Sequence, residues 1–222
     1  MKKFYVVGNG VSKSLSPTIF NYWFRKYKIK ASYDYLELNE NNFDLKISKK
    51  LSDKKVIGMN ITIPFKKKII KHVNKLDKHA NKIGAVNCLK NGKNISGTNT
   101  DWDGYYRTLP TKKEIFNKKI LLIGYGGAAL AIHYVLSMKG FKHITILNRS
   151  KKKLSFTKKT NYTKGTNLLS NYLKNAEIII NTTPKNPIKK INKNLVSQNV
   201  LLSDIVYSPK ETAFLKQFPK NK

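Results

Sequence analysis

Residues 118–140 have the sequence KKILLIGYGGAALAIHYVLSMKG, in which a short apolar run leads through a glycine-rich turn into a longer apolar segment. The short run predicts a buried β-strand, and the segment after the turn has the length and composition of a helix. HITILNRS at 143–150 predicts the next strand, which completes a βαβ unit. The later runs AEIIINTTP and VLLSDIVYSP continue the alternation. This half of the chain is therefore predicted to be an α/β fold with a doubly wound parallel sheet.

The glycine-rich turn has the spacing of a dinucleotide-binding loop. Gly124, Gly126 and Ala129 match the pattern G-x-G-x-x-[GA] between a predicted strand and a predicted helix. The first glycine permits the tight turn, the second lets the backbone approach a pyrophosphate, and the small third residue lets the helix pack closely. The helix that begins here also presents free N–H groups and the positive end of its dipole to phosphates. A Rossmann-like cofactor domain is predicted, with a purely structural glycine turn as the alternative.

The end of the second strand distinguishes NADP from NAD. An NAD site carries Asp or Glu about 20 residues after the glycines, where it binds the ribose 2′-hydroxyl. Here Asn148, Arg149 and Ser150 stand at that place, and a guanidinium can pair with a 2′-phosphate that a carboxylate would repel. NADP(H) is therefore the predicted cofactor, with a solvated basic loop as the alternative for the lysines that follow. The predicted cofactor-binding residues are Gly124, Gly126, Gly127, Ala128, Asn148, Arg149, Ser150, Lys153 and Thr182.

The N-terminal half predicts a separate α/β domain with its own sheet. The expected elements are strands at 4–7, 32–38 and 56–63, helices at 18–27 and 65–73, and a hairpin formed by 85–89 and 95–98. Pro64 ends the third strand, and Ser16-Pro17 opens the first helix. We expect this substrate-binding domain at 1–104 and the cofactor domain at 105–222, joined by a short helix at 105–109 and a polar linker at 110–117.

Polar residues of the first domain occur where ordinary surface positions do not explain them. They lie beside the first glycine turn, in the strand before Pro64, and within and at the end of the predicted hairpin, and are Ser14, Ser16, Asn60, Thr62, Asn87, Asn99, Thr100 and Asp101. Taken singly, each could be a helix cap or a turn residue. Taken together, they point to a polar site.

The chain resembles the shikimate dehydrogenase family. The segments that carry the resemblance, in the family's order from Phe4 to about Leu215, are GNGVSKSLSP, MNITIPFKKKI, IGAVNCL, GTNTDWDGY, LLIGYGGAA, LNRS, INTTP and SDIVYSP. The combination of N-x-T-x-P-F-K, N-T-D and the glycine-rich turn is highly specific. The resemblance implies a substrate-binding α/β domain followed by a Rossmann-like NADP-binding domain. It also implies an oxidoreductase that reduces 3-dehydroshikimate to shikimate with NADPH, in the biosynthesis of chorismate and the aromatic amino acids.

The resemblance assigns roles to the polar residues. It implies that Lys66 is the catalytic lysine and Asp101 its partner. The assignment is chemically sensible, because an ammonium can give a proton to the alkoxide that forms from a ketone, and a carboxylate can hold that ammonium. Asn99 is expected to support the site through its backbone contacts, with a purely structural turn as the alternative. The implied substrate-binding residues are Ser14 and Ser16 for the substrate carboxylate, Thr62, Asn87 and Asp101 for the ring hydroxyls, and Tyr207 in the same pocket.

The sequence departs from the family pattern at several positions. Gly10 and Lys13 stand where the family usually has Pro and His, and Cys88 stands where Thr is common. Tyr125 replaces a small residue inside the glycine-rich turn, so its side chain must point away from the pyrophosphate or crowd the cofactor. Family members normally continue beyond Lys222 into a helix that returns to the first domain, and we expect the loss of that segment to loosen the site.

The charge of the chain would ordinarily indicate a nucleic-acid partner, since the formal net charge is +32 at pH 7. Only Arg25, Arg107 and Arg149 are arginines, however, and nucleic-acid surfaces use arginine for bidentate contacts. We therefore expect the charge to be spread over solvated faces. The single cysteine, Cys88, excludes an intramolecular disulfide, and no apolar run has the length of a membrane span, so a cytoplasmic protein is predicted.

Three alternatives remain open from the sequence. The chain could be a quinate or shikimate dehydrogenase that uses NAD, a degenerate homologue that binds without catalysis, or a basic nucleic-acid-binding protein. The third is disfavoured, because no pattern of interleaved aromatic and basic residues is present. We expect a small-molecule substrate, no metal site, no specific nucleic acid, no membrane, and a monomer or homodimer.

Overall fold

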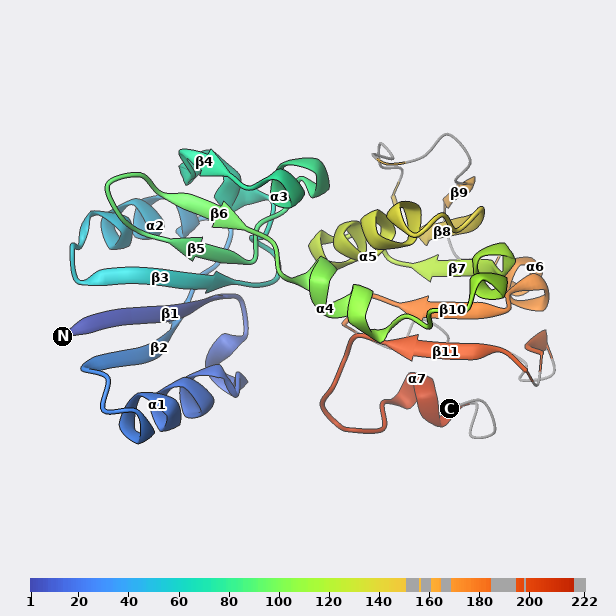
Figure 1. Ribbon diagram of the computed structural model, residues 1–222, viewed down its shortest axis with the longest axis horizontal. Coiled ribbons are helices and arrows are strands. Elements are labelled where there is room, and N and C mark those ends of the chain that lie inside the picture. The colour runs from blue at the N-terminus through green and yellow to red at the C-terminus, as the bar shows by residue number, and fades with distance from the viewer. Residues whose placement is uncertain (151–155, 157–160, 165–168, 185–194, 198, 218–222) are drawn as a thin grey trace. The chain divides into compact units, whose positions relative to one another are not determined.

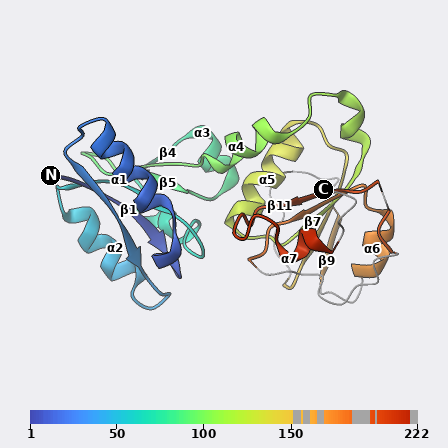
Figure 2. The ribbon, with the colours of Figure 1, turned by 90° about the horizontal axis from the view of Figure 1, so that it is seen from below.

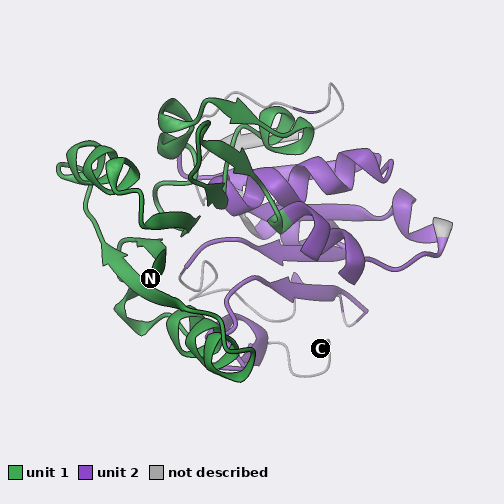
Figure 3. Ribbon diagram, turned by 60° about the vertical axis from the view of Figure 1, so that its left-hand side comes forward, with its two compact units in different colours: residues 1–101 green, residues 102–222 purple. Residues whose placement is uncertain are grey.

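The computed structural model describes residues 1–150, 156, 161–164, 169–184, 195–197 and 199–217. The chain divides into two compact units, Met1–Asp101 and Trp102–Lys222 (Figure 3). The division lies at the start of helix α4 (Asp101–Thr108), whereas the sequence pattern placed the boundary after Gly104. The helix expected at 105–109 therefore begins earlier, at Asp101.

A six-stranded mixed sheet forms the centre of unit 1, in the order β2-β1-β3-β5-β6-β4 (Figure 1). Its strands are β1 (Lys2–Gly8), β2 (Ala31–Glu37), β3 (Val56–Ile61), β4 (Lys75–Leu76), β5 (Cys88–Lys90) and β6 (Ser96–Thr98). Strand β1 pairs in parallel with both β2 and β3. Strands β5 and β6 pair antiparallel, which confirms the predicted hairpin around Asn91-Gly92.

The helices of unit 1 lie on both faces of this sheet. They are α1 (Ser16–Lys26), α2 (Phe43–Ser52), α3 (Lys78–Ile83) and the 3₁₀ helices η1 (Val11–Lys13) and η2 (Lys68–His72). The chain passes from β1 to β2 in one direction along the sheet and from β2 to β3 in the other. Right-handed connections then place α1 and α2 on opposite sides of β1, as Figure 2 shows.

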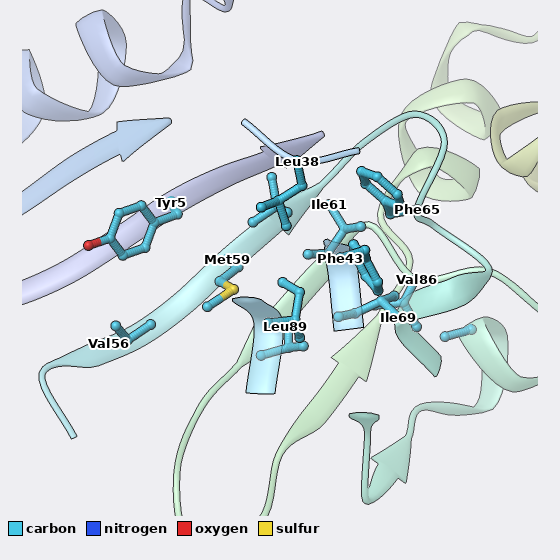
Figure 4. Close-up of a cluster of buried hydrophobic side chains, with 13 residues drawn as sticks. Tyr5, Leu38, Phe43, Val56, Met59, Ile61, Phe65, Ile69, Val86 and Leu89 are labelled. Carbon is cyan, nitrogen blue, oxygen red and sulfur yellow. The ribbon is translucent and has the colours of Figure 1, made fainter. Parts of the chain in front are cut away.

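Alternate residues of β1 supply two cores. Val6 packs in a cluster with Phe20 of α1, and Val7 packs in a cluster with Phe43 of α2. The second cluster is the larger one (Figure 4). Within it the rings of Phe43 and Phe65 stack with their centroids 4.2 Å apart, and both side chains are fully buried. Each such side chain stabilises the fold by about 1.5–3 kcal/mol, so Phe65 anchors the segment that follows β3.

The helix predicted at 65–73 is wrong in type and length, because only residues 68–72 are helical and they form a 3₁₀ helix. One α-type bond, from Ile69 N to Phe65 O, is followed by 3₁₀ bonds from Ile70 N to Lys67 O and from Val73 N to Ile70 O. In a 3₁₀ helix residues i and i+3 lie on the same side. Ile70 and Val73 both pack against the core in this way.

A five-stranded parallel sheet forms the centre of unit 2, in the order β11-β10-β7-β8-β9 (Figure 1). Its strands are β7 (Lys119–Ile123), β8 (His143–Asn148), β9 (Asn161–Lys164), β10 (Ile178–Asn181) and β11 (Leu201–Asp204). The helices among the described residues of this unit are α4, α5 (Gly127–Met138), α6 (Leu169–Asn175), α7 (Ala213–Lys216) and the 3₁₀ helix η3 (Lys113–Asn117), which lies in the predicted linker. The predicted doubly wound parallel sheet is confirmed. None of the helices in the described part of the chain is long and apolar enough to cross a membrane.

Both faces of this sheet are buried, which explains why its strands are continuous apolar runs. Leu121 of β7 packs in a cluster with Leu173 of α6 and Phe214 of α7. Leu122 points to the opposite face and is also fully buried. Strand β7 lies between β8 and β10. The strands β8 and β9 that follow β7 in the chain extend the sheet on one side, whereas the later strands β10 and β11 extend it on the other side. The carboxyl ends of β7 and β10 are therefore the place where such a fold binds a ligand.

Candidate active site

The carboxyl ends of β1 and β3 meet closely in unit 1. A Cβ added to Gly8 would lie 2.5 Å from Thr62 Cγ2, so only glycine fits beside the end of β3. Asn9 N donates to Ile63 O at 3.0 Å, and Thr62 N donates to Val7 O at 2.8 Å. The loop that carries the two predicted serines and the loop that carries Lys66 therefore start from the same edge of the sheet.

Lys66 and Asp101 form an ion pair in this unit. Lys66 Nζ donates to Asp101 Oδ2 at 2.6 Å, although Lys66 lies in the loop after β3 and Asp101 begins α4. The two side chains are 12% and 27% exposed, so solvent screens their attraction only in part. Charge-assisted hydrogen bonds of this length are the strong ones. An ammonium held in this way can stabilise a negative oxygen and give it a proton.

Asn87 holds the other oxygen of the same carboxylate. Its Nδ2 donates to Asp101 Oδ1 at 2.7 Å, and its Oδ1 accepts from Thr100 N at 2.8 Å. Asn99 is 1% exposed; it donates to Ala85 O at 2.9 Å and accepts from Asp101 N at 3.0 Å. Asn99 thus shapes the turn before Asp101, and the structure brings Lys66, Asn87 and Asp101 together as neighbours.

The predicted serines lie at the start of α1. Ser14 Oγ accepts a hydrogen bond from Ser16 N at 3.2 Å, and Pro17 occupies the first turn of the helix. Both serine side chains and that of Thr62 are half-buried. Three hydroxyls therefore flank the edge of the sheet where the Lys66 loop begins, which is a suitable lining for an oxygen-rich ligand.

Two further residues lie at this edge: Tyr33, which the sequence did not indicate, and Asn60, which it placed among the polar residues without a role. Tyr33 OH donates to Asn60 Oδ1 at 2.6 Å. Burial raises the pKa of the Tyr33 phenol well above its usual range, with a smaller contribution from Cys88, so the phenol is neutral. Asn60 alternates with Thr62 in the N-x-T-x-P-F-K motif, which identified it as polar but did not indicate its contact with Tyr33. Tyr33 gave no such signal, since a tyrosine is an ordinary residue within a predicted strand such as 32–38.

Glu37 was also missed. It ends β2, and its two carboxylate oxygens accept hydrogen bonds from Gly10 N and, at 2.9 Å, from Val11 N. Gly10 has a φ of 73°, a conformation that glycine adopts without strain. The carboxylate thus fixes the backbone between β1 and Ser14. A single acidic residue after a strand is too common a pattern to predict this contact.

The glycine-rich turn of unit 2 lies against the end of β10. Gly124 has a φ of 94°, and a Cβ placed there would lie 2.6 Å from Thr182 Oγ1. Thr182 is buried, and its hydroxyl donates to Ile123 O at 2.7 Å. Gly126 is exposed and precedes α5, whose first residues are Gly127 and Ala128. The turn therefore presents open backbone at the N-terminus of a helix, where phosphates bind.

The predicted residues for the 2′-phosphate follow β8. Asn148 ends the strand, and its Nδ2 donates to Ser150 O at 2.8 Å, which closes a tight turn. Arg149 within that turn is exposed and can reach an anion. Lys153 lies outside the residues that the structure describes.

Tyr207 lies in unit 2, after β11, and is 71% exposed. The segment before it is braced by Asp204, which accepts from Asn181 Nδ2 at 3.1 Å, from Val206 N at 3.0 Å and from Thr212 Oγ1 at 2.6 Å. These bonds tie the carboxyl ends of β10 and β11 together and position the chain on which Tyr207 stands.

Two family models match the chain. A model described as the shikimate dehydrogenase substrate binding domain matches residues 6–89, and a model described as shikimate / quinate 5-dehydrogenase matches residues 109–206. The first covers most of unit 1, with Lys66 and Asn87, and the second covers the sheet of unit 2.

Individual proteins resemble the chain over nearly its whole length. The shikimate dehydrogenase (NADP(+)) of Pelagibacter ubique is 33% identical over 99% of this chain and 84% of its own length. The protein of the same name from Staphylococcus aureus is 36% identical over 97% of this chain and 82% of its own. The crystal structure of shikimate dehydrogenase from Aquifex aeolicus superposes with a TM-score of 0.83 at 29% identity, over 100% of this chain and 84% of that one. The chain belongs to the shikimate dehydrogenase family.

Proposed function

We propose that this protein is an NADPH-dependent shikimate dehydrogenase of the cytoplasm, which reduces the ketone of 3-dehydroshikimate to the hydroxyl of shikimate. The observation that carries the proposal is the pair formed by Lys66 and Asp101, with 2.6 Å between Nζ and Oδ2. It provides a proton donor next to a carboxylate in a unit that matches a substrate-binding domain. The names of both curated relatives support the cofactor and the substrate.

Lys66 is the proposed acid. When bound, NADPH supplies the hydride that adds to the carbonyl carbon. Negative charge then develops on the carbonyl oxygen, and the Lys66 ammonium stabilises this charge and transfers a proton to the oxygen. The neutral amine regains a proton from water. Asp101 keeps the lysine in place and accepts a hydrogen bond from a substrate hydroxyl, while Asn87 fixes the orientation of the carboxylate.

The residues of unit 2 fit the cofactor. A Cβ at Gly126 would meet no heavy atom of the described residues within 4 Å, so the backbone there is open to a phosphate. The first N–H groups of α5, at Gly127 and Ala128, have no carbonyl to bond within the helix and would hold the pyrophosphate. Arg149, with Asn148, Ser150 and Lys153, would hold the 2′-phosphate. Thr182 would keep the turn in shape from the end of β10.

The residues of unit 1 fit the substrate. Ser14 and Ser16 would donate hydrogen bonds to its carboxylate, and Thr62 and Asn87 would bind its ring hydroxyls. Tyr207 of unit 2 remains a proposed substrate-binding residue. We accordingly propose unit 1 as the substrate-binding domain and unit 2 as the NADP-binding domain.

Steady-state kinetics test the proposal. The loss of NADPH absorbance is followed with 3-dehydroshikimate for the wild type, for Lys66→Ala and for Lys67→Ala, an exposed neighbour that serves as the control. We expect turnover by the wild type and by Lys67→Ala, and a loss of about 10²–10⁴-fold in kcat for Lys66→Ala. A folded wild type that binds NADPH without turnover would contradict the proposal.

A further inference from the structure

Tyr125 stands inside the glycine-rich turn, between Gly124 and Gly126. The structure buries its side chain, which is only 3% exposed, while Gly126 beside it is exposed. The ring therefore lies on the inner side of the turn, away from the open backbone at which a phosphate would bind. The sequence left two possibilities, that the Tyr125 side chain points away from the pyrophosphate or that it crowds the cofactor. The structure has the side chain pointing away.

The Tyr125 hydroxyl lies 2.9 Å from Nδ1 of His133 in helix α5. His133 is fully buried, and burial lowers its pKa from 6.5 to about 4, so the ring is neutral near pH 7. A phenol can donate to a neutral ring nitrogen or accept from it, so this hydrogen bond forms in either tautomer. It joins the turn to a position further along the helix that the turn precedes.

Aromatic contacts hold this pair in place. The centroids of the Tyr125 and His133 rings are 5.7 Å apart, and the rings of His133 and Phe156 form a T-shaped contact with 5.2 Å between centroids. Phe156 also contacts Tyr134, the next residue of α5. Such edge-on contacts restrict the rotation of each ring, so the hydrogen bond has a defined geometry.

The location of the pair gives it a consequence for ligand binding. The residues between Tyr125 and His133 include Gly126, Gly127 and Ala128, which carry the N–H groups proposed to hold the pyrophosphate. A glycine-rich turn has many conformations when nothing restrains it. A loop already held in its bound geometry loses less entropy on binding and therefore binds more tightly.

We propose that Tyr125 is a positioning residue for the cofactor, because its hydroxyl, bonded to His133, pins the glycine-rich turn to α5 in the geometry that receives the pyrophosphate. The inference rests on the proposed NADPH-dependent function. NADPH and NADH share the pyrophosphate, so the pair affects the affinity for both nucleotides equally. This distinguishes its role from that of Arg149, which concerns the 2′-phosphate alone.

The test measures the Kd of the full chain for NADPH and for NADH by the fluorescence of the bound nucleotide. Tyr125→Phe removes only the hydroxyl, and we expect about fivefold weaker binding of both nucleotides, the size of one lost hydrogen bond. Tyr125→Ala weakens binding further. Tyr172→Phe, which removes a hydroxyl from α6 in the same unit, is the matched control and leaves both Kd values unchanged. Adding His133→Leu to Tyr125→Phe causes no further loss, because their shared bond is already gone.

Three results would overturn the inference. These are wild-type affinity in Tyr125→Phe, a loss for NADPH without a loss for NADH, and an equal loss in Tyr172→Phe. Because Tyr125→Phe preserves the volume of the ring, its Kd values still test the inference if Tyr125→Ala fails to fold. A wild type that binds neither nucleotide would overturn the proposed function as well, whereas a wild type that binds both, with unaffected variants, would overturn this inference alone.

Discussion

Asn87 Nδ2 lies 2.7 Å from Asp101 Oδ1, while Lys66 Nζ lies 2.6 Å from the second oxygen of the same carboxylate. The carboxylate is thus held from both sides. Its two donors come from loops that follow different elements, the strand β3 and the helix α3. The orientation of Asp101 therefore depends on Asn87 as much as on the ion pair.

Replacing Asn87 tests this dependence. Asn87→Asp preserves the shape but sets two carboxylates against each other, which raises the pKa of one of them. We expect kcat/KM to fall by about 100-fold near pH 7 and to recover in part toward pH 6, as the shared site takes up a proton. Asn87→Ala removes the donor without adding charge, so its loss is smaller and shows no recovery. Identical pH profiles for the two variants would contradict this account.

Arg149 is proposed to select the cofactor through its charge. We expect Arg149→Glu to raise the KM for NADPH by at least about tenfold and to leave the KM for NADH nearly unchanged, because only NADPH carries the 2′-phosphate. Lys142→Glu makes the same charge change just before β8, at the opposite end of that strand, and serves as the control. Equal increases in the KM for both nucleotides would refute the assignment.

Comparing alanine substitutions at Gly124 and Gly140 distinguishes the cost of backbone strain from the cost of a steric contact. Both have positive φ, 94° and 87°, so alanine at either position costs about 1–2 kcal/mol in unfolding free energy. A Cβ at Gly124 would also lie 2.6 Å from Thr182 Oγ1, whereas at Gly140 no heavy atom of the described residues lies within 4 Å. Denaturant unfolding should therefore show a larger loss for Gly124→Ala, and only that variant should lose nucleotide affinity. If Gly124→Ala and Gly140→Ala bound the nucleotide with the same Kd, this would contradict the role of the close contact at Gly124 in nucleotide binding.

His133 makes the stability depend on pH. Its folded pKa is lowered to about 4 by burial, so between about pH 6.5 and that value the unfolded chain binds more protons, and stability falls as the pH falls. This histidine alone should cost about 2 kcal/mol in unfolding free energy between about pH 7 and pH 5. Urea unfolding should show that His133→Gln loses this part of the dependence, while the variant His143→Gln, exposed at the start of β8, retains it. If the unfolding free energy of His133→Gln kept the pH dependence of the wild type, His133 would not be the source of that dependence.

The helix expected at 65–73 and the connecting helix expected at 105–109 show where sequence patterns are weak. The apolar spacing from Phe65 to Val73 suits a helix, but the core into which these side chains pack selects a 3₁₀ turn. The start of α4 at Asp101 follows from the bond between Asn99 Oδ1 and Asp101 N, which residue types alone did not reveal. Both outcomes depend on packing rather than on local preference.

The sequence by itself determined the βαβ pattern around residues 118–150 and the glycine-rich turn, because these signals depend on short spacings along one chain. It pointed to Lys66, Asn87 and Asp101 only through the resemblance of their motifs to the family. Only the tertiary structure decided which side chains meet. The 2.6 Å contact of Tyr33 with Asn60, the Glu37 carboxylate on the loop before Ser14, and the bond of Tyr125 to His133 each follow from how strands and helices pack. Contacts of this kind depend on strand register and helix rotation, which many residues set together and which no single segment of sequence encodes.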